Sequence, residues 1–267
     1  MFNRIFSKQN RALLGELVRT DFKLRYQGSV LGYTWSLLRP LMLFLIMYVV
    51  FVRFLRLGGD VPHYPIYLLL GLVLWQFFSD MTSQGLKSVV DRSDLIRKVS
   101  IPRWIIVIST SISALINLSF NLVVVLIFMF VNGTAFLATA LWLPVLIFET
   151  YVLSLGLALF LSAAYVKYRD ITHIWEVVIQ AAFYATPVLY PITLIKNANY
   201  QKLLLINPVA QVVQDGRYVL VTHDSKTIAT TFNSPWARLV PIAIVAITLI
   251  IGCLYFKRQE KNFAENL

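Results

Sequence analysis

The 45 residues between Trp104 and Phe148 contain no charged side chain. Because one membrane-spanning helix needs about 20 apolar residues, this run is long enough for two. The pair Asn132-Gly133 lies within it, and such a dipeptide is typical of a turn. The run therefore predicts two successive spans, at about 104–131 and 136–166.

The rest of the chain is also strongly apolar. Of its 267 residues, 58% are hydrophobic and only 14% are charged, and the mean hydropathy is +0.70. A soluble core cannot bury so much apolar surface, so the sequence predicts an all-α integral membrane protein. The single cysteine, Cys253, excludes an internal disulfide and provides no metal-site spacing.

Residues 30–267 are predicted to form one transmembrane domain of six helices. Its spans are expected at about 31–52, 66–86, 104–131, 136–166, 172–190 and 239–256. The second span must continue past Asp80, whose carboxylate should then face protein or water. The stretch 191–236 has apolar pieces too short to cross a bilayer, which favours short re-entrant or interfacial helices on the outer side.

Residues 1–29 are predicted to form an amphipathic helix before the first span. Its apolar side chains occupy about half of the helical wheel. Asp21 and Arg25 intrude on that half, but their i, i+4 spacing allows them to pair. The helix is suited to the cytoplasmic interface, with its basic face toward anionic lipid headgroups, and equally to docking another protein.

The net charge of +11 is best explained by membrane topology. With both termini in the cytoplasm, the inner segments hold 17 Lys and Arg residues and the outer segments hold 7. This asymmetry favours cytoplasmic termini, and an even number of spans agrees with it. The basic charge therefore predicts contact with membrane lipid and no nucleic-acid partner.

The segment 88–103 lies between the second and third spans. Leu95, Ile96 and Val99 fall on one stripe of a short helix, with charged residues around the rest of it. Pro102 is expected to end this helix, because proline disfavours helical backbone in the preceding residue. Such a helix can receive force from a soluble partner, although an ordinary solvated loop helix has the same pattern.

Five segments stand in the order and spacing of a known family. The first runs from Arg25-Tyr26 through Leu31-Gly32 and Trp35 to Arg39-Pro40. The second is Leu95–Val99 with Pro102, and the third is Arg169-Asp170-Ile171. The last two are Thr186–Pro191 and Asn207-Pro208 followed by Arg217. Together they resemble the permease subunit of ABC-2-type exporters of lipid-linked polysaccharide, a group that includes O-antigen, capsule and teichoic acid permeases. The resemblance covers nearly the whole chain.

The resemblance implies a homodimer in the bacterial inner (plasma) membrane with two ATP-binding cassette subunits on its cytoplasmic face. The chain has no GxxxxGK[ST] phosphate loop, so it is not expected to be an enzyme or to hold a cofactor. ATP and Mg²⁺ are expected on the partner subunit. The segment 88–103 then becomes the coupling helix, with contacts from Asp91, Asp94, Leu95, Ile96, Arg97, Lys98 and Pro102.

Substrate contacts can be suggested from side-chain chemistry. Sugar C–H faces stack on aromatic rings, which makes Tyr33, Trp35, Phe183 and Tyr184 candidates for lining the conduit, although aromatic residues also anchor helices at membrane interfaces. Arg25 and Arg39 are candidates for binding the pyrophosphate of a lipid carrier, because guanidinium groups match phosphate oxygens. Simple anchoring at the inner leaflet explains both arginines equally well.

Two other functions remain open at this point. An ABC-2 exporter of a small lipid or drug would share the predicted spans without requiring a wide aromatic conduit. A membrane enzyme or scaffold acting on lipid-linked sugar should show acids or histidines clustered at one membrane face. No such cluster is visible in the sequence.

Overall fold

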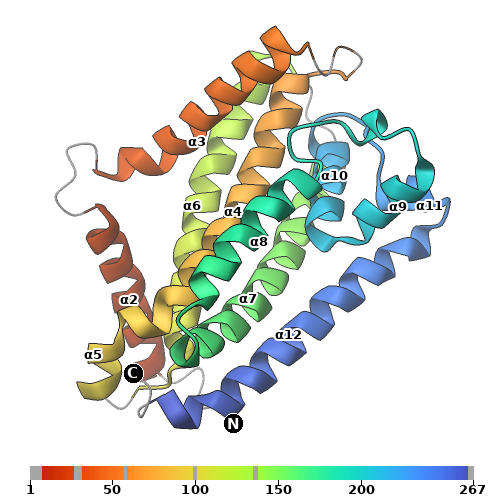
Figure 1. Cartoon of the computed structure of the whole chain (residues 1–267). Helices are drawn as coiled ribbons and strands as arrows, with labels where there is room; N and C mark the ends of the chain where they lie inside the picture. The colour runs from red at the N-terminus through yellow and green to blue at the C-terminus, as the bar shows by residue number, and fades with distance from the viewer. Residues whose placement is uncertain are drawn as a thin grey trace.

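The computed structural model describes residues 8–26, 32–56, 59, 61–98, 101–134 and 138–263. Over these residues every regular element is a helix, which confirms the predicted all-α class (Figure 1). The N-terminal helix predicted within 1–29 is present as α2 (Lys8–Tyr26), and it packs beside α6.

Five helices among the described residues are long and apolar enough to cross a membrane, so the chain is a multi-pass membrane protein. They are α3 (Trp35–Met47) continued by a π-helical turn (Tyr48–Phe54), α4 (Tyr64–Asp91), α6 (Trp104–Val131), α7 (Leu143–Lys167) preceded by a 3-10 turn (Ala138–Trp142), and α12 (Leu239–Gln259) flanked by 3-10 turns (Pro235–Arg238 and Glu260–Asn262).

The turn predicted between the third and fourth spans is confirmed. Helix α6 ends at Val131, and Gly133 follows with a φ of +63°. Glycine adopts this left-handed conformation without the steric penalty of a Cβ atom.

The predicted span at 172–190 differs from the helix that forms there. Helix α8 (Ile171–Ala185) has 15 residues, about 22 Å at the α-helical rise, whereas the hydrocarbon core is about 30 Å thick. It ends because Thr186 is extended, as expected for the residue before Pro187. Helix α8 nevertheless returns the chain toward the end of the bundle where α10 lies (Figure 1).

The region between α8 and the last span consists of short helices. They are a 3-10 turn (Ile192–Leu194), α9 (Ala198–Ile206), α10 (Pro208–Leu220) and α11 (Ile228–Phe232). The Asn207 side chain caps α10 by accepting a hydrogen bond from the Val209 amide at 3.0 Å, and Pro208 suits the first helical position. Nearly every side chain of α10 is buried, and the helix packs on α4 and α7.

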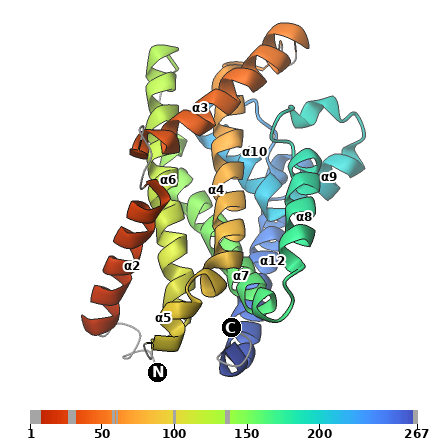
Figure 2. The same ribbon diagram turned by 60° about the vertical axis from the view of Figure 1, so that its left-hand side comes forward.

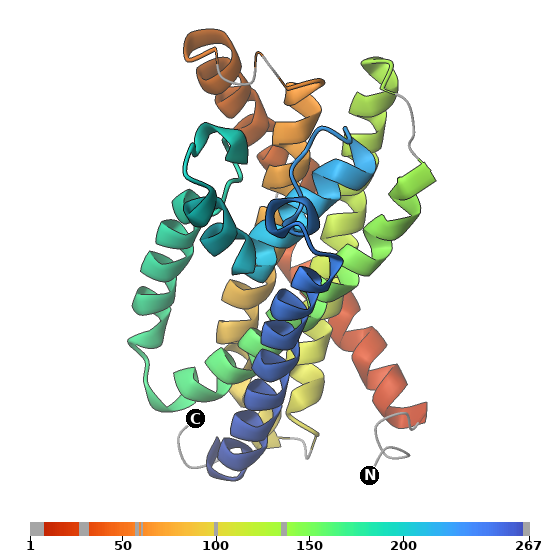
Figure 3. The same cartoon turned by 90° about the vertical axis from the view of Figure 1, so that its right-hand side faces the viewer.

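Helix α4 is the central element, with α3, α6, α7 and α8 in contact with it (Figure 2). Helices α7 and α12 cross most closely at two glycines (Figure 3). A Cβ atom on Gly252 would overlap the carbonyl oxygen of Gly156, and one on Gly156 would lie 2.7 Å from the Cα of Leu249. This crossing therefore requires residues without side chains.

We expect Gly252→Ala to separate α12 from α7 and to lower the thermal midpoint of the detergent-solubilised protein. Overpacking of this kind costs about 1–3 kcal/mol. Cys253→Leu is the matched control, since Cys253 is the next residue and is exposed. A Gly252→Ala protein with the midpoint of the control would contradict the close crossing.

Candidate functional site

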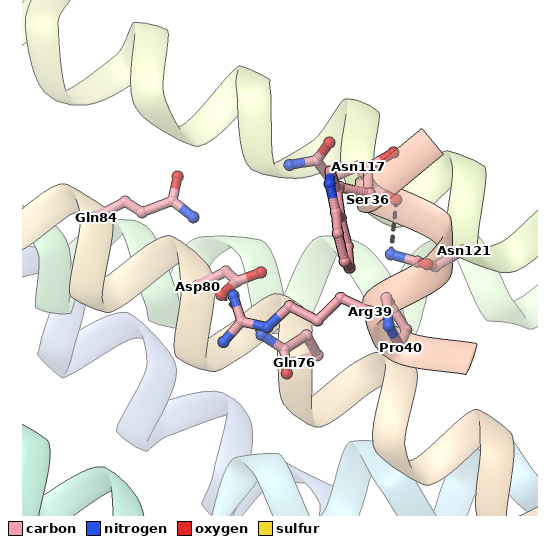
Figure 4. Close-up of a pocket in the computed structure, with 9 residues that line it drawn as sticks. Ser36, Arg39, Pro40, Gln76, Asp80, Gln84, Asn117 and Asn121 are labelled. Atoms are coloured by element: carbon pink, nitrogen blue, oxygen red, sulfur yellow. Dashed lines mark hydrogen bonds between the residues drawn. The ribbon is translucent and has the colours of Figure 1, made fainter. Parts of the chain in front are cut away.

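A polar cavity of about 370 Å³ lies between α3, α4 and α6 (Figure 4). Its lining combines one aromatic residue with cationic, acidic and amide side chains: Trp35, Ser36, Arg39, Pro40, Gln76, Asp80, Gln84, Asn117 and Asn121. Two independent sequence-based candidates, Trp35 for sugar stacking and Arg39 for phosphate, thus line the same cavity.

The polar lining comes from regular positions on two helices. Gln76, Asp80 and Gln84 are four residues apart along α4, and Asn117 and Asn121 are four apart along α6. Side chains at this spacing lie on one helical face. Each helix therefore turns a polar stripe toward α3, in agreement with the prediction that Asp80 faces protein or water.

Arg39 extends from α3 toward Asp80 and Gln76 of α4 (Figure 4). The Gln76 side-chain amide donates a hydrogen bond to the Asp80 carboxylate at 2.7 Å, which fixes the orientation of that carboxylate. Within the described part of the chain, the buried Asn117 side-chain oxygen has no hydrogen-bond partner. A guanidinium donor matches phosphate oxygens, whereas carboxylate and amide groups form hydrogen bonds with sugar hydroxyls.

The other candidate aromatic residues lie elsewhere. Phe183 and Tyr184 belong to α8. Helices α8 and α3 both contact α4, but they lie on different sides of it (Figure 2). The Phe183 ring packs on the buried Trp75 of α4 at a centroid distance of 5.6 Å, while Tyr184 is 65% exposed. The side chains of Tyr33 and Arg25 lie outside the part of the chain that the structure describes.

The candidate coupling segment contains a short helix, α5 (Ser93–Lys98). Asp91 is the last residue of α4, and Pro102 lies just before α6. Ile96 packs against an apolar cluster formed by residues of α4, α6, α7 and α12 together with Phe263, whereas the charged side chains of Asp94, Arg97 and Lys98 are exposed. Helix α5 therefore has one side attached to the bundle and a charged side available to a partner.

Arg217 of α10 is fully buried and was not selected as a site residue from the sequence. It donates hydrogen bonds to the backbone carbonyls of Tyr67 (3.0 Å), Pro187 (2.6 Å) and Val188 (2.5 Å). Its guanidinium also lies 3.6 Å from the centre of the Tyr67 ring. One side chain thus joins α10, α4 and the segment after α8.

A second polar group lies where α10 meets α7 and α12. The Asp215 carboxylate accepts a hydrogen bond from Gln211 at 2.9 Å and pairs with Arg238 at 3.4 Å. Burial raises the pKa of the Asp215 carboxyl group above its usual range. Glu149 of α7 lies beside this group, near Asp215, Gln211 and Arg238.

Residues 12–221 match the family model described as ABC-2 type transporter. The chain belongs to the ABC-2 transporter family. An ABC-2 permease is the membrane subunit of a transporter and works with an ATP-binding cassette partner, as the sequence resemblance implied.

Similar proteins cover almost the entire length of this ABC-2 chain. The O-antigen export system permease protein RfbA of Myxococcus xanthus is 29% identical over 97% of this chain and 96% of its own length. Two proteins of the same name from Klebsiella pneumoniae are 26% and 27% identical, each over 96% of this chain and 95% of its own length.

Proposed function

We propose that this chain is the permease subunit of an ATP-driven exporter that moves a lipid-linked, O-antigen-like polysaccharide outward across the bacterial inner (plasma) membrane. The observation that carries the proposal is the polar cavity of Trp35, Arg39 and Asp80, located between spanning helices of an ABC-2 permease. The near full-length similarity to O-antigen export permeases supports the choice of substrate.

In this proposal the cavity binds the polar part of the substrate. Arg39 provides the guanidinium for a carrier pyrophosphate, and the amides of α4 and α6 provide hydrogen bonds for sugar hydroxyls. Trp35 lines the cavity and is 43% exposed, and its aromatic ring provides the kind of surface on which a sugar can stack.

The proposed assembly contains two copies of this chain and two ATP-binding cassette subunits, which hold ATP and Mg²⁺. Trp35 on α3 and Tyr184 on α8 lie on separate sides of α4 within one copy. In the proposed assembly, the α3 aromatic residue of one copy and the α8 aromatic residue of the other therefore line the same conduit. Both helices carry exposed apolar side chains that such a homodimer would cover in part.

The proposed topology places α5, α2 and both termini in the cytoplasm. Helix α8 then acts as the sixth crossing, with the segment Thr186–Pro191 completing its path. The excess of Lys and Arg in the inner segments supports this orientation.

We expect Arg39→Ala to reduce surface polysaccharide by at least about tenfold, because removing one well-placed charged group from a binding site costs about 1.5–3 kcal/mol. The measurement is surface glycan in cells that express the variant as their only copy. Arg53→Ala is the control, since Arg53 lies at the other end of the same span. Normal export by Arg39→Ala would remove the cavity from the substrate path.

A further inference from the structure

The connection from α4 through α5 to α6 is flanked by two arginines. Arg92 lies directly before α5, and Arg103 lies between Pro102 and the start of α6. Arg92 contacts Asp21 near the beginning of the chain, and Arg103 contacts Glu260 near its end. Figure 1 shows α5, α2 and the last turns of α12 toward the same end of the bundle.

Arg92 joins α2 to the beginning of the coupling segment. Its guanidinium forms an ion pair with Asp21 of α2 and donates a hydrogen bond to the Ser109 hydroxyl of α6 at 3.1 Å. The Arg92 and Asp21 side chains are only 16% and 20% exposed. Partial burial and the second hydrogen bond distinguish this contact from an ordinary surface ion pair, which contributes little.

Arg103 joins the end of the chain to the other side of the coupling segment. It donates a hydrogen bond to the backbone carbonyl of Glu260, and its guanidinium lies 5.8 Å from the centre of the Phe263 ring. Phe263 is 1% exposed and packs edge-on against Phe256 of α12. The segment Glu260–Phe263 is therefore built into the same apolar cluster that contacts Ile96.

We infer that Asp21 and Phe263 are positioning residues for the two ends of the coupling segment. Asp21 holds Arg92 beside α2 and α6, and Phe263 holds Arg103 beside the end of α12. If the connections from α5 to α4 and α6 were loose, movement of a partner bound to α5 would shift those connections and leave the bundle in place. With both ends fixed, displacement of α5 has to move α6 and the attached bundle. The inference rests on the proposed exporter function and on the coupling role that the family resemblance implies for α5.

The test uses the intact complex with its ATPase subunit and the variants Asp21→Asn and Phe263→Ala. Two quantities are measured: ATP hydrolysis by the purified complex, and surface polysaccharide labelled in cells with a membrane-impermeant hydrazide after mild periodate oxidation. We expect the ratio of export to hydrolysis to fall by at least about fivefold, a typical lower value for coupling between sites. The KM for ATP should stay unchanged.

Rescue separates positioning from simple stability. The exchange Asp21→Arg with Arg92→Asp restores the ion pair and should recover most of the lost ratio, even if a single variant is poorly folded. Glu16→Gln on the same helix is the control, because the Glu16–Arg19 pair is 71% and 81% exposed and should not matter.

The outcomes also distinguish this inference from the function on which it rests. Wild-type ratios in Asp21→Asn and Phe263→Ala, or an exchange variant no better than Asp21→Asn, would overturn the positioning role. If alanine at Leu95, Ile96 and Arg97 also left the ratio unchanged, the coupling function of α5 itself would be wrong.

Discussion

Replacing Arg217 with methionine is expected to be the most destabilising single change in this protein. The substitution removes hydrogen bonds to three buried carbonyls and the contact with the Tyr67 ring. Each hydrogen bond from a charged donor is worth about 1.5–3 kcal/mol, and the carbonyls would remain buried without partners. We therefore expect a loss above about 3 kcal/mol, seen as a lower thermal midpoint in detergent, together with loss of export.

Two further variants define the cause. Arg258→Met is the control for loss of an exposed arginine and should leave the midpoint unchanged. Gly71→Ala should reproduce part of the Arg217→Met effect, because a Cβ atom at Gly71 would overlap the Arg217 guanidinium. A stable, active Arg217→Met protein would show that α10 is held in place without the hydrogen bonds of Arg217.

The second large effect is expected in α5. Alanine at Leu95, Ile96 and Arg97 removes the apolar contact of α5 with the bundle and one of its exposed charges. Export should fall by at least about tenfold, equivalent to about 1.4 kcal/mol of lost coupling or binding. The ATPase subunit should either bind more weakly or hydrolyse ATP without export.

Export and ATPase co-purification are measured together for this triple variant. Alanine at Asp94 and Lys98 is the companion variant, because it removes exposed charges and leaves the contact of Ile96 intact. A defect in the companion as well as in the triple variant would place part of the coupling on the charged side of α5. Normal binding and normal export in the triple variant would exclude α5 as the coupling helix.

The apolar runs of the sequence predicted most of the helices that the structure contains. The uncharged run from Trp104 and the turn at Asn132-Gly133 located α6 and α7, because length and turn chemistry are local properties. The end of α8 was misplaced by five residues, although Pro187 already indicated a break. Local patterns were sufficient where no distant contact decides the outcome.

Long-range contacts account for what the sequence did not reveal. Arg217 was counted among the outer charges, yet it is buried because three carbonyls from two other segments meet it. Asp21 pairs with Arg92, 71 residues away, which no local pattern indicated. The i, i+4 pairing of Asp21 with Arg25 stays a prediction, because the Arg25 side chain lies outside the described part of the chain. The spacing of Gln76, Asp80 and Gln84 indicates a polar face on one helix. Only the structure shows that α3 places its own side chains opposite this face.

The most direct test of the central proposal is the fate of lipid-linked polysaccharide when the chain is depleted from its native membrane. Surface glycan is labelled with an impermeant reagent, and carrier-linked glycan is quantified in the inner-membrane fraction. The proposal requires surface label to fall while carrier-linked glycan accumulates inside, with recovery by the wild-type chain and not by Arg39→Ala. Unchanged surface glycan with retention of a small lipid would contradict it and identify a small-lipid exporter.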